Sequence, residues 1–233
     1  MFRIACLVLS SLAAAASHAA QPAAPAVLAS GDLLSRLQVA APGIDRTALS
    51  LALDARDCAI RSGTVTASQR LGVIDYSRPS TERRLWVFDL SHARLLYNEF
   101  VAHGRGSGEN FATAFSNRDG SHQSSLGLFV TADTYVGGNG YSLRMEGLEP
   151  GVNDKAMSRT IVMHGAPYVD PDLASQQGRL GRSYGCPALR PAVAREMIDT
   201  LKQGQLLFAY YPDRDWIAHS RFFSCPIQAV TSR

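Results

Sequence analysis

Apolar positions follow a helical pattern near the start of the chain and shorter runs further along. Four residues with helical spacing indicate a first short helix: Leu33, Leu34, Leu37 and Val39. Asp45 is a suitable N-cap for a second helix, whose apolar positions are Leu49, Leu51, Leu53 and Ile60. We therefore expect residues 31–70 to form a helical segment ahead of the main domain.

Beyond Gly72 the apolar runs become short and are separated by Gly, Ser and Asn, which is typical of strands joined by loops. The predicted strands are residues 84–90, 94–102, 127–131, 141–145, 159–164 and 206–211, with a hairpin turn at 91–93. A late helix is indicated by Pro191 in its first turn and Gly204 after its end, with apolar positions at Val193, Met197, Ile198 and Leu201. The pattern predicts a mainly β domain of the α+β class over residues 71–233, with a few helices packed on it.

The first residues have the features of a secretory signal. Arg3 is followed by the apolar stretch 4–16, and Ser17-His18-Ala19 offers small residues where a signal peptidase cuts. The apolar stretch is shorter than the roughly 20 residues of a spanning helix, so we expect cleavage after Ala19 and no membrane span afterwards. Residues 20–30 are rich in Ala and Pro, which predicts a flexible spacer. The protein is therefore expected to be exported.

Composition narrows the class of protein further. The chain has 233 residues, 46% of them hydrophobic, with a formal net charge of +3 and no Lys/Arg-rich block. These values are ordinary for one globular domain and do not favour nucleic acid as a partner. They leave the oligomeric state open.

Cysteine count directs attention to one thiol. Cys6 falls within the signal, so the exported chain keeps Cys58, Cys186 and Cys225. An odd number of cysteines in an oxidising compartment leaves one thiol unpaired.

Cys186 has the context of a reactive thiol. It stands between Gly185 and Pro187 ahead of the late helix, and we expect Arg182, Arg190 and that helix N-terminus to favour its thiolate. A thiolate that transfers acyl groups needs a base, and the best candidate is His164 at the end of a predicted strand. Gly165 follows His164 and would tolerate close approach of a substrate. The histidine precedes the cysteine, which argues against papain-like enzymes.

Several segments carry a resemblance to a known family. They are Val101-Ala-His-Gly-Arg-Gly-Ser-Gly, Ser121-His-Gln-Ser-Ser-Leu-Gly, Gly147-Leu-Glu-Pro-Gly-Val-Asn, Ile161-Val-Met-His-Gly and Gly181-Arg-Ser-Tyr-Gly-Cys-Pro-Ala. Together they span roughly 75–212 and resemble the YkuD-type L,D-transpeptidases, specifically the murein L,D-transpeptidase catalytic domain family. The resemblance implies a YkuD-like β-sandwich or barrel-like fold. Because the family occurs mainly in Gram-negative bacteria, it also implies that the exported chain resides in the periplasm of a Gram-negative envelope.

The family's histidine-glycine pair and Ser/Thr-x-Gly-Cys pattern match His164, Gly165, Ser183, Gly185 and Cys186. By this resemblance, Cys186 attacks the diaminopimelate carbonyl of a peptidoglycan tetrapeptide stem, D-Ala leaves, and an amine resolves the thioester. The backbone N–H of Cys186 and that of Gly185 or Tyr184 would bind the oxyanion. No cofactor is implied.

This chain departs from the family pattern beside the nucleophile. Tyr184 and Ala188 stand where many relatives have histidine and arginine, so Arg190 or Arg182 becomes the candidate for binding a stem carboxylate. His103 and Ser125, in Gly/Ser-rich loops, are further candidates for lining the groove.

Other readings stay open. Water in place of the amine would make the protein an L,D-carboxypeptidase, and loss of turnover would make it a peptidoglycan-binding protein. A zinc peptidase is disfavoured because His103, His122 and His164 lack the usual ligand spacing, so no metal is expected. Cys58 and Cys225 are the favoured disulfide pair, with a bridge from Cys186 to either one as the alternative. The acyl acceptor is open among a stem peptide, a lipoprotein, a D-amino acid and water.

Overall fold

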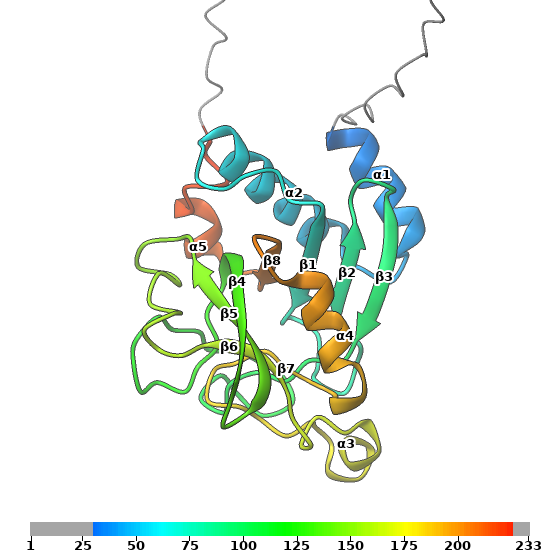
Figure 1. Ribbon diagram of the computed structural model, residues 1–233, viewed down its shortest axis with the longest axis vertical. Coiled ribbons are helices and arrows are strands. Elements are labelled where there is room, and N and C mark those ends of the chain that lie inside the picture. The colour runs from blue at the N-terminus through cyan, green and yellow to red at the C-terminus, as the bar shows by residue number, and fades with distance from the viewer. Residues whose placement is uncertain (1–29, 226–233) are drawn as a thin grey trace, which may run out of the picture.

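Eight strands and five helices make up the computed structural model, which describes residues 30–225 (Figure 1). The helices are α1 (Ser30–Ala40), α2 (Arg46–Arg61), α3 (Pro171–Gln177), α4 (Pro191–Leu201) and α5 (Arg214–His219). The strands are β1 (Arg70–Asp75), β2 (Leu85–Asp89), β3 (Arg94–Glu99), β4 (Gly127–Gly137), β5 (Gly140–Gly147), β6 (Val162–Gly165), β7 (Ala188–Leu189) and β8 (Leu206–Tyr210). The expected signal segment and the spacer up to residue 29 lie outside the described residues.

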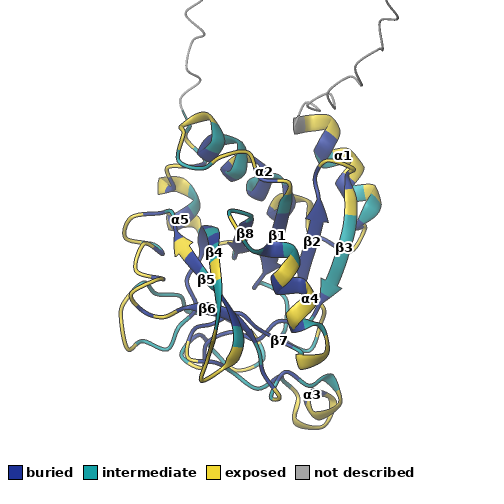
Figure 2. Cartoon of the chain, viewed as in Figure 1, coloured by how far each residue is buried: buried dark blue, intermediate teal, exposed yellow. Residues whose placement is uncertain are grey.

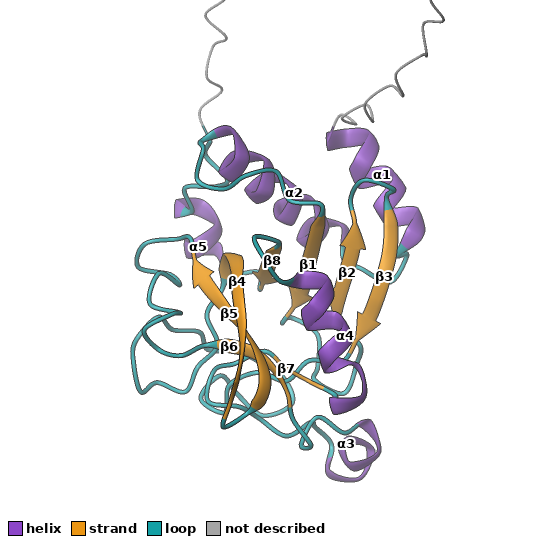
Figure 3. Cartoon of the chain, in the orientation of Figure 1, coloured by secondary structure: helices purple, strands orange, loops and turns teal. Residues whose placement is uncertain are grey.

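All eight strands belong to one mixed sheet with the order β3-β2-β1-β8-β4-β5-β6-β7. The pairs β1–β8 and β6–β7 are parallel, and the others are antiparallel. The segment that follows β3 returns to the opposite end of the sheet, where Ala102 pairs with Ala188 of β7. This pairing brings the two ends of the sheet together, so the sheet nearly closes into a barrel. Loops gather around the closing end, next to α3 (Figure 3).

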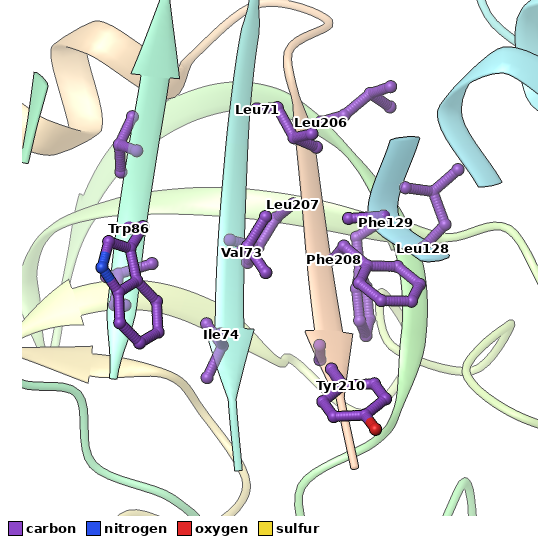
Figure 4. Packing of buried hydrophobic residues seen from close by; sticks show 14 of the residues in the cluster. Leu71, Val73, Ile74, Trp86, Leu128, Phe129, Leu206, Leu207, Phe208 and Tyr210 are labelled. Atoms are coloured by element: carbon purple, nitrogen blue, oxygen red, sulfur yellow. The ribbon is translucent and has the colours of Figure 1, made fainter. Parts of the chain in front are cut away.

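Part of the hydrophobic core lies where β1 and β8 run side by side. Leu71 and Val73 of β1 are paired with Leu206 and Phe208 of β8, and their side chains pack with those of neighbouring strands (Figure 4). Every residue of β2 and β8 is buried, as expected for strands covered on both faces (Figure 2). Helix α2 packs against β1, β4 and β8, while α4 packs against β1, β5 and β6.

The predicted helical segment forms and joins this same core. Asp45 is the N-cap of α2 as expected, since its carboxylate accepts a hydrogen bond of 2.9 Å from the Ala48 N–H. Leu37 of α1 and Leu49 of α2 are fully buried. Within residues 30–225, none of the helices has the length and apolar character required to cross a membrane.

The predicted mainly β fold with packed helices is confirmed, and so are the 91–93 turn and helix α4. Strand β1 was not predicted. Its Gly72 packs closely against β8, since an added Cβ would lie 2.5 Å from the Leu207 side chain. The short elements α3, α5 and β7 were not predicted either. Helices of seven and six residues show little periodicity, and the two residues of β7 show none. The strand predicted from 159 begins only at Val162, since Thr160 has a φ of +54° that no strand accommodates.

A buried carboxylate connects β4, β5 and α5. Glu149, which follows β5, is 2% exposed, and its carboxylate accepts hydrogen bonds from Leu128 N–H, Trp216 Nε1–H and Ser220 Oγ–H. The adjacent Asn153 side chain bonds the backbone at 126, 128 and 149. The Gly147-Leu-Glu-Pro-Gly-Val-Asn segment is therefore a structural brace.

Candidate active site

One pocket of about 320 Å³ contains both proposed catalytic side chains. It is lined by Asn139, Arg159, Thr160, Ile161, His164, Tyr168, Arg182, Ser183, Tyr184 and Cys186. His164 lies on β6, and Cys186 precedes β7, the parallel neighbour in which Ala188 is paired with His164. The β6–β7 pairing explains how residues 22 positions apart in the sequence open onto one cavity.

Cys186 is a free thiol, 8% exposed, whereas Cys58 and Cys225 form a disulfide that ties α2 to the segment after α5. Its Sγ accepts the Val162 N–H at 3.5 Å and lies 3.8 Å from the Thr160 carbonyl oxygen. Burial raises the pKa of the Cys186 thiol, while the Val162 N–H and the charge of Arg159 act in the opposite direction. The expectation of a favoured thiolate is therefore wrong for the resting site, because burial dominates.

The turn before Cys186 is braced by Ser183. The Ser183 hydroxyl donates to the Cys186 carbonyl at 2.6 Å and accepts the Gly185 N–H at 3.1 Å. Gly185 has a φ of +123°, and an added Cβ would lie 2.8 Å from Ile161 Cδ1. Glycine is therefore required here by both conformation and space.

This geometry bears on the expected oxyanion site. The Gly185 N–H is already occupied by Ser183, so it is not free to bind an oxyanion. In the described part of the chain, the N–H groups of Tyr184 and Cys186 have no protein acceptor. They are the remaining donors of the turn.

His164 is 4% exposed, and its ring is oriented by the backbone carbonyl of the next residue, Gly165. Its Nδ1 lies 3.0 Å from the Gly165 carbonyl oxygen, which can only accept, so the proton is on Nδ1 and Nε2 is left as the basic nitrogen. Burial lowers the pKa of His164, so the ring is neutral at pH 7. Within residues 30–225, the partners of the Cys186 thiol are backbone groups and not this ring.

Gly165 has a packing role. An added Cβ would lie 2.9 Å from the Ala194 Cβ of α4, and Gly165 does not line the pocket. The expectation that Gly165 allows close approach of a substrate is wrong, because helix α4 packs against this residue.

The candidate arginines have carboxylate partners. Arg190 forms a bidentate pair with Glu99 at 2.6 and 2.9 Å and is not part of the pocket lining. Arg182 lines the pocket but donates to Glu109 at 2.7 Å. Of the two, Arg182 is therefore the one that a bound carboxylate could meet.

His103 and Ser125 lie behind the pocket instead of lining it. His103 is fully buried, accepts a hydrogen bond of 2.7 Å from the fully buried Arg84, and has a pKa lowered to about 4 by burial and by that charge. Ser125 donates to the Ser116 carbonyl and accepts from Arg159. Both residues support loops around the site.

Tyr184 forms part of the rim. It is 64% exposed, its ring centroid lies 4.6 Å from that of His122, and the Arg105 guanidinium stands 4.5 Å above it. His103, His122 and His164 therefore have different partners: the first contacts Arg84, the second Arg105 and Tyr184, and the third the Gly165 carbonyl. Among the described residues, no group of three His, Cys, Asp or Glu side chains is placed to hold a metal ion.

Arg159 is one of the pocket residues that the sequence analysis did not identify, together with Asn139, Thr160, Ile161 and Tyr168. It is 9% exposed, and its guanidinium donates to the carbonyl oxygens of Ser116 and Gln123 and to the hydroxyls of Ser121 and Ser125. Its place at the start of an apolar run gave no signal of this role, because all four acceptors lie 34 or more positions earlier in the chain.

Fold and pocket together define a class: a β-rich domain in which a free cysteine and a histidine open onto one cavity. A profile described as the L,D-transpeptidase catalytic domain, YkuD_2, matches residues 40–210. The chain belongs to this family of enzymes, and the resemblance drawn from its motifs is confirmed.

Solved structures of low sequence identity are also similar. An L,D-transpeptidase from Mycobacterium smegmatis has 14% identity and a TM-score of 0.40, covering 62% of this chain and 60% of that enzyme. L,D-transpeptidase 3 from Mycobacterium tuberculosis has 14% identity and a TM-score of 0.38, covering 62% of each chain. An L,D-transpeptidase from Stackebrandtia nassauensis has 12% identity and a TM-score of 0.38, covering 79% of this chain and 92% of that one. This chain thus spans about 60% of the first of these enzymes. A search of curated protein sequences found no match.

Proposed function

We propose that this protein is an exported L,D-transpeptidase that acts on peptidoglycan tetrapeptide stems through a thioester at Cys186. The observation that carries the proposal is that the one free thiol of the described chain and a neutral histidine open onto the same pocket of a YkuD-type domain.

In the first half-reaction, Cys186 Sγ bonds to the carbonyl carbon of diaminopimelate and its proton passes to His164 Nε2. The C–N bond to D-Ala then breaks, and His164 returns the proton to the departing amine. The unoccupied N–H groups of Tyr184 and Cys186 would meet the oxyanion, a contribution of about 3 kcal/mol for one such donor.

In the second half-reaction, an amine of another stem attacks the thioester carbonyl. His164 accepts the proton of that amine and gives it to sulfur, which restores the thiol and leaves a new amide bond. Water in place of the amine would make the reaction an L,D-carboxypeptidase step. Arg182, at the pocket, is the group we assign to a stem carboxylate.

Product analysis by mass spectrometry tests this proposal. Protein without residues 1–19 is incubated with purified tetrapeptide muropeptides, beside Cys186→Ala and His164→Ala. His219→Ala, at an exposed histidine of α5, is the matched control. We expect D-Ala and cross-linked dimers from the wild type and the control only. D-Ala without dimers would identify the carboxypeptidase, and unchanged muropeptides in every sample would refute action on these stems.

Export is tested separately. The full chain is expressed in a Gram-negative host, and the periplasmic form is sequenced from its N-terminus. We expect it to begin at Ala20, whereas a product that keeps residues 1–19 in the cytoplasm would overturn the proposal.

A further inference from the structure

Arg159 carries a buried positive charge with no carboxylate beside it. All of its hydrogen-bond acceptors are neutral oxygens, at distances of 2.6 to 3.2 Å. Other arginines around the site differ, since Arg182 pairs with Glu109 and Arg190 with Glu99. Within residues 30–225, no ion pair is formed by Arg159.

An isolated buried charge is unfavourable unless dipoles or an opposite charge compensate it. The four oxygens around Arg159 supply dipoles and hold the guanidinium at the wall of the pocket. Asp119, the acid that interacts with it, is exposed and therefore screened by solvent. Among the groups that share the pocket with Arg159, the Cys186 thiol is the acid with the lowest ordinary pKa.

We propose that Arg159, held by the 116–125 loop, is the counter-ion of the Cys186 thiolate, and that His164 acts as a neutral base instead of the imidazolium half of an ion pair. The assignment rests on the proposed function for the role of Cys186 as nucleophile. Arg159 is a positioning residue in this scheme, because it acts through the sulfur.

The other titratable groups that face Cys186 are neutral or already paired, so they do not supply a counter-ion for its thiolate. Burial raises the pKa of Tyr76 and, to about 12, that of Tyr168, so both phenols are uncharged at pH 7. Burial lowers the pKa of His164, which is then neutral as well. Arg182 is paired with Glu109, and Tyr184 is exposed beneath Arg105. Arg159 and Arg182 are the cations that line the pocket, so removing Arg159 would leave only Arg182, which is already paired with Glu109.

The sign of the expected effect follows from this arrangement. A cation next to a thiol favours its charged form and lowers its pKa, so loss of the cation raises the pKa. Burial and Arg159 act in opposite directions on Cys186, and removing Arg159 leaves burial unopposed by charge.

Alkylation of Cys186 by iodoacetamide, followed by intact mass across a pH series, measures this pKa without substrate. Non-reducing conditions keep Cys58 and Cys225 bonded, so Cys186 is the reacting thiol of the described chain. We expect Arg159→Met to raise the midpoint by about one pH unit, which is roughly tenfold slower alkylation below the midpoint. Arg159→Lys, which keeps the charge, should stay within about half a unit of the wild type, and so should His164→Asn.

A second variant guards against misfolding of Arg159→Met. Ser121→Asp, on the half-exposed loop, gives the guanidinium a carboxylate of its own and should also raise the midpoint. Unchanged midpoints in folded Arg159→Met, or in Ser121→Asp where the first does not fold, would overturn the assignment. A shift with His164→Asn alone would replace it with a thiolate–imidazolium pair. Since no muropeptide is used, failure of the proposed transpeptidase reaction would leave this result intact.

Discussion

Replacing Glu149 with alanine is expected to remove about 4.5 kcal/mol from the free energy of unfolding. The carboxylate accepts three hydrogen bonds, at 2.9 Å from Leu128 N, 3.0 Å from Trp216 Nε1 and 2.6 Å from Ser220 Oγ. Hydrogen bonds to a charged group contribute about 1.5–3 kcal/mol each. Three bonds in one network are not additive, and the orphaned donors relax partly, so we take about half of the upper sum.

Urea unfolding followed by tryptophan fluorescence measures the loss, because Trp216 is one of two tryptophans and bonds Glu149 directly. The matched control is Glu146→Ala, an exposed glutamate on β5 three residues earlier, which should cost less than about 0.5 kcal/mol. A loss below about 1 kcal/mol for Glu149→Ala, or equal losses for the two variants, would refute the idea that this carboxylate braces β4 against α5.

Three further outcomes are expected. The Cys58→Ser/Cys225→Ser double variant should lose about 2–4 kcal/mol in urea unfolding, because the disulfide closes a long loop, and wild type with reductant should lose as much; equal stability would contradict this. Gly185→Ala should abolish D-Ala release, because the new Cβ would lie 2.8 Å from Ile161 and the residue has a φ of +123°. The control variant Gly43→Ala, whose Cβ would meet no atom within 4 Å, should keep D-Ala release. Burial lowers the pKa of His164, so the neutral base persists below pH 6.5. The acid limb of the kcat/KM profile should therefore lie below pH 6.5, and a limb above that pH would count against His164 as the base.

Much of the candidate site followed from short segments of sequence. The Ser-x-Gly-Cys pattern pointed to Cys186, and the apolar strand ending in a histidine pointed to His164. Both residues do line one pocket. The roles suggested for Arg190, His103 and Gly165 did not follow, because their partners Glu99, Arg84 and Ala194 come from distant segments.

Local signals in the sequence determined the helices α2 and α4, strand β8, the β2–β3 turn and the position of the thiol, because caps, turn residues and periodicity act over a few neighbouring residues. The tertiary structure alone decided the closing of the sheet at Ala102, the hydrogen bonds of Glu149 and the placing of Arg159 in the same pocket as Cys186. Each of these depends on which distant groups satisfy a buried polar atom or charge. Folding settles that question through contacts between segments, and no local pattern encodes it.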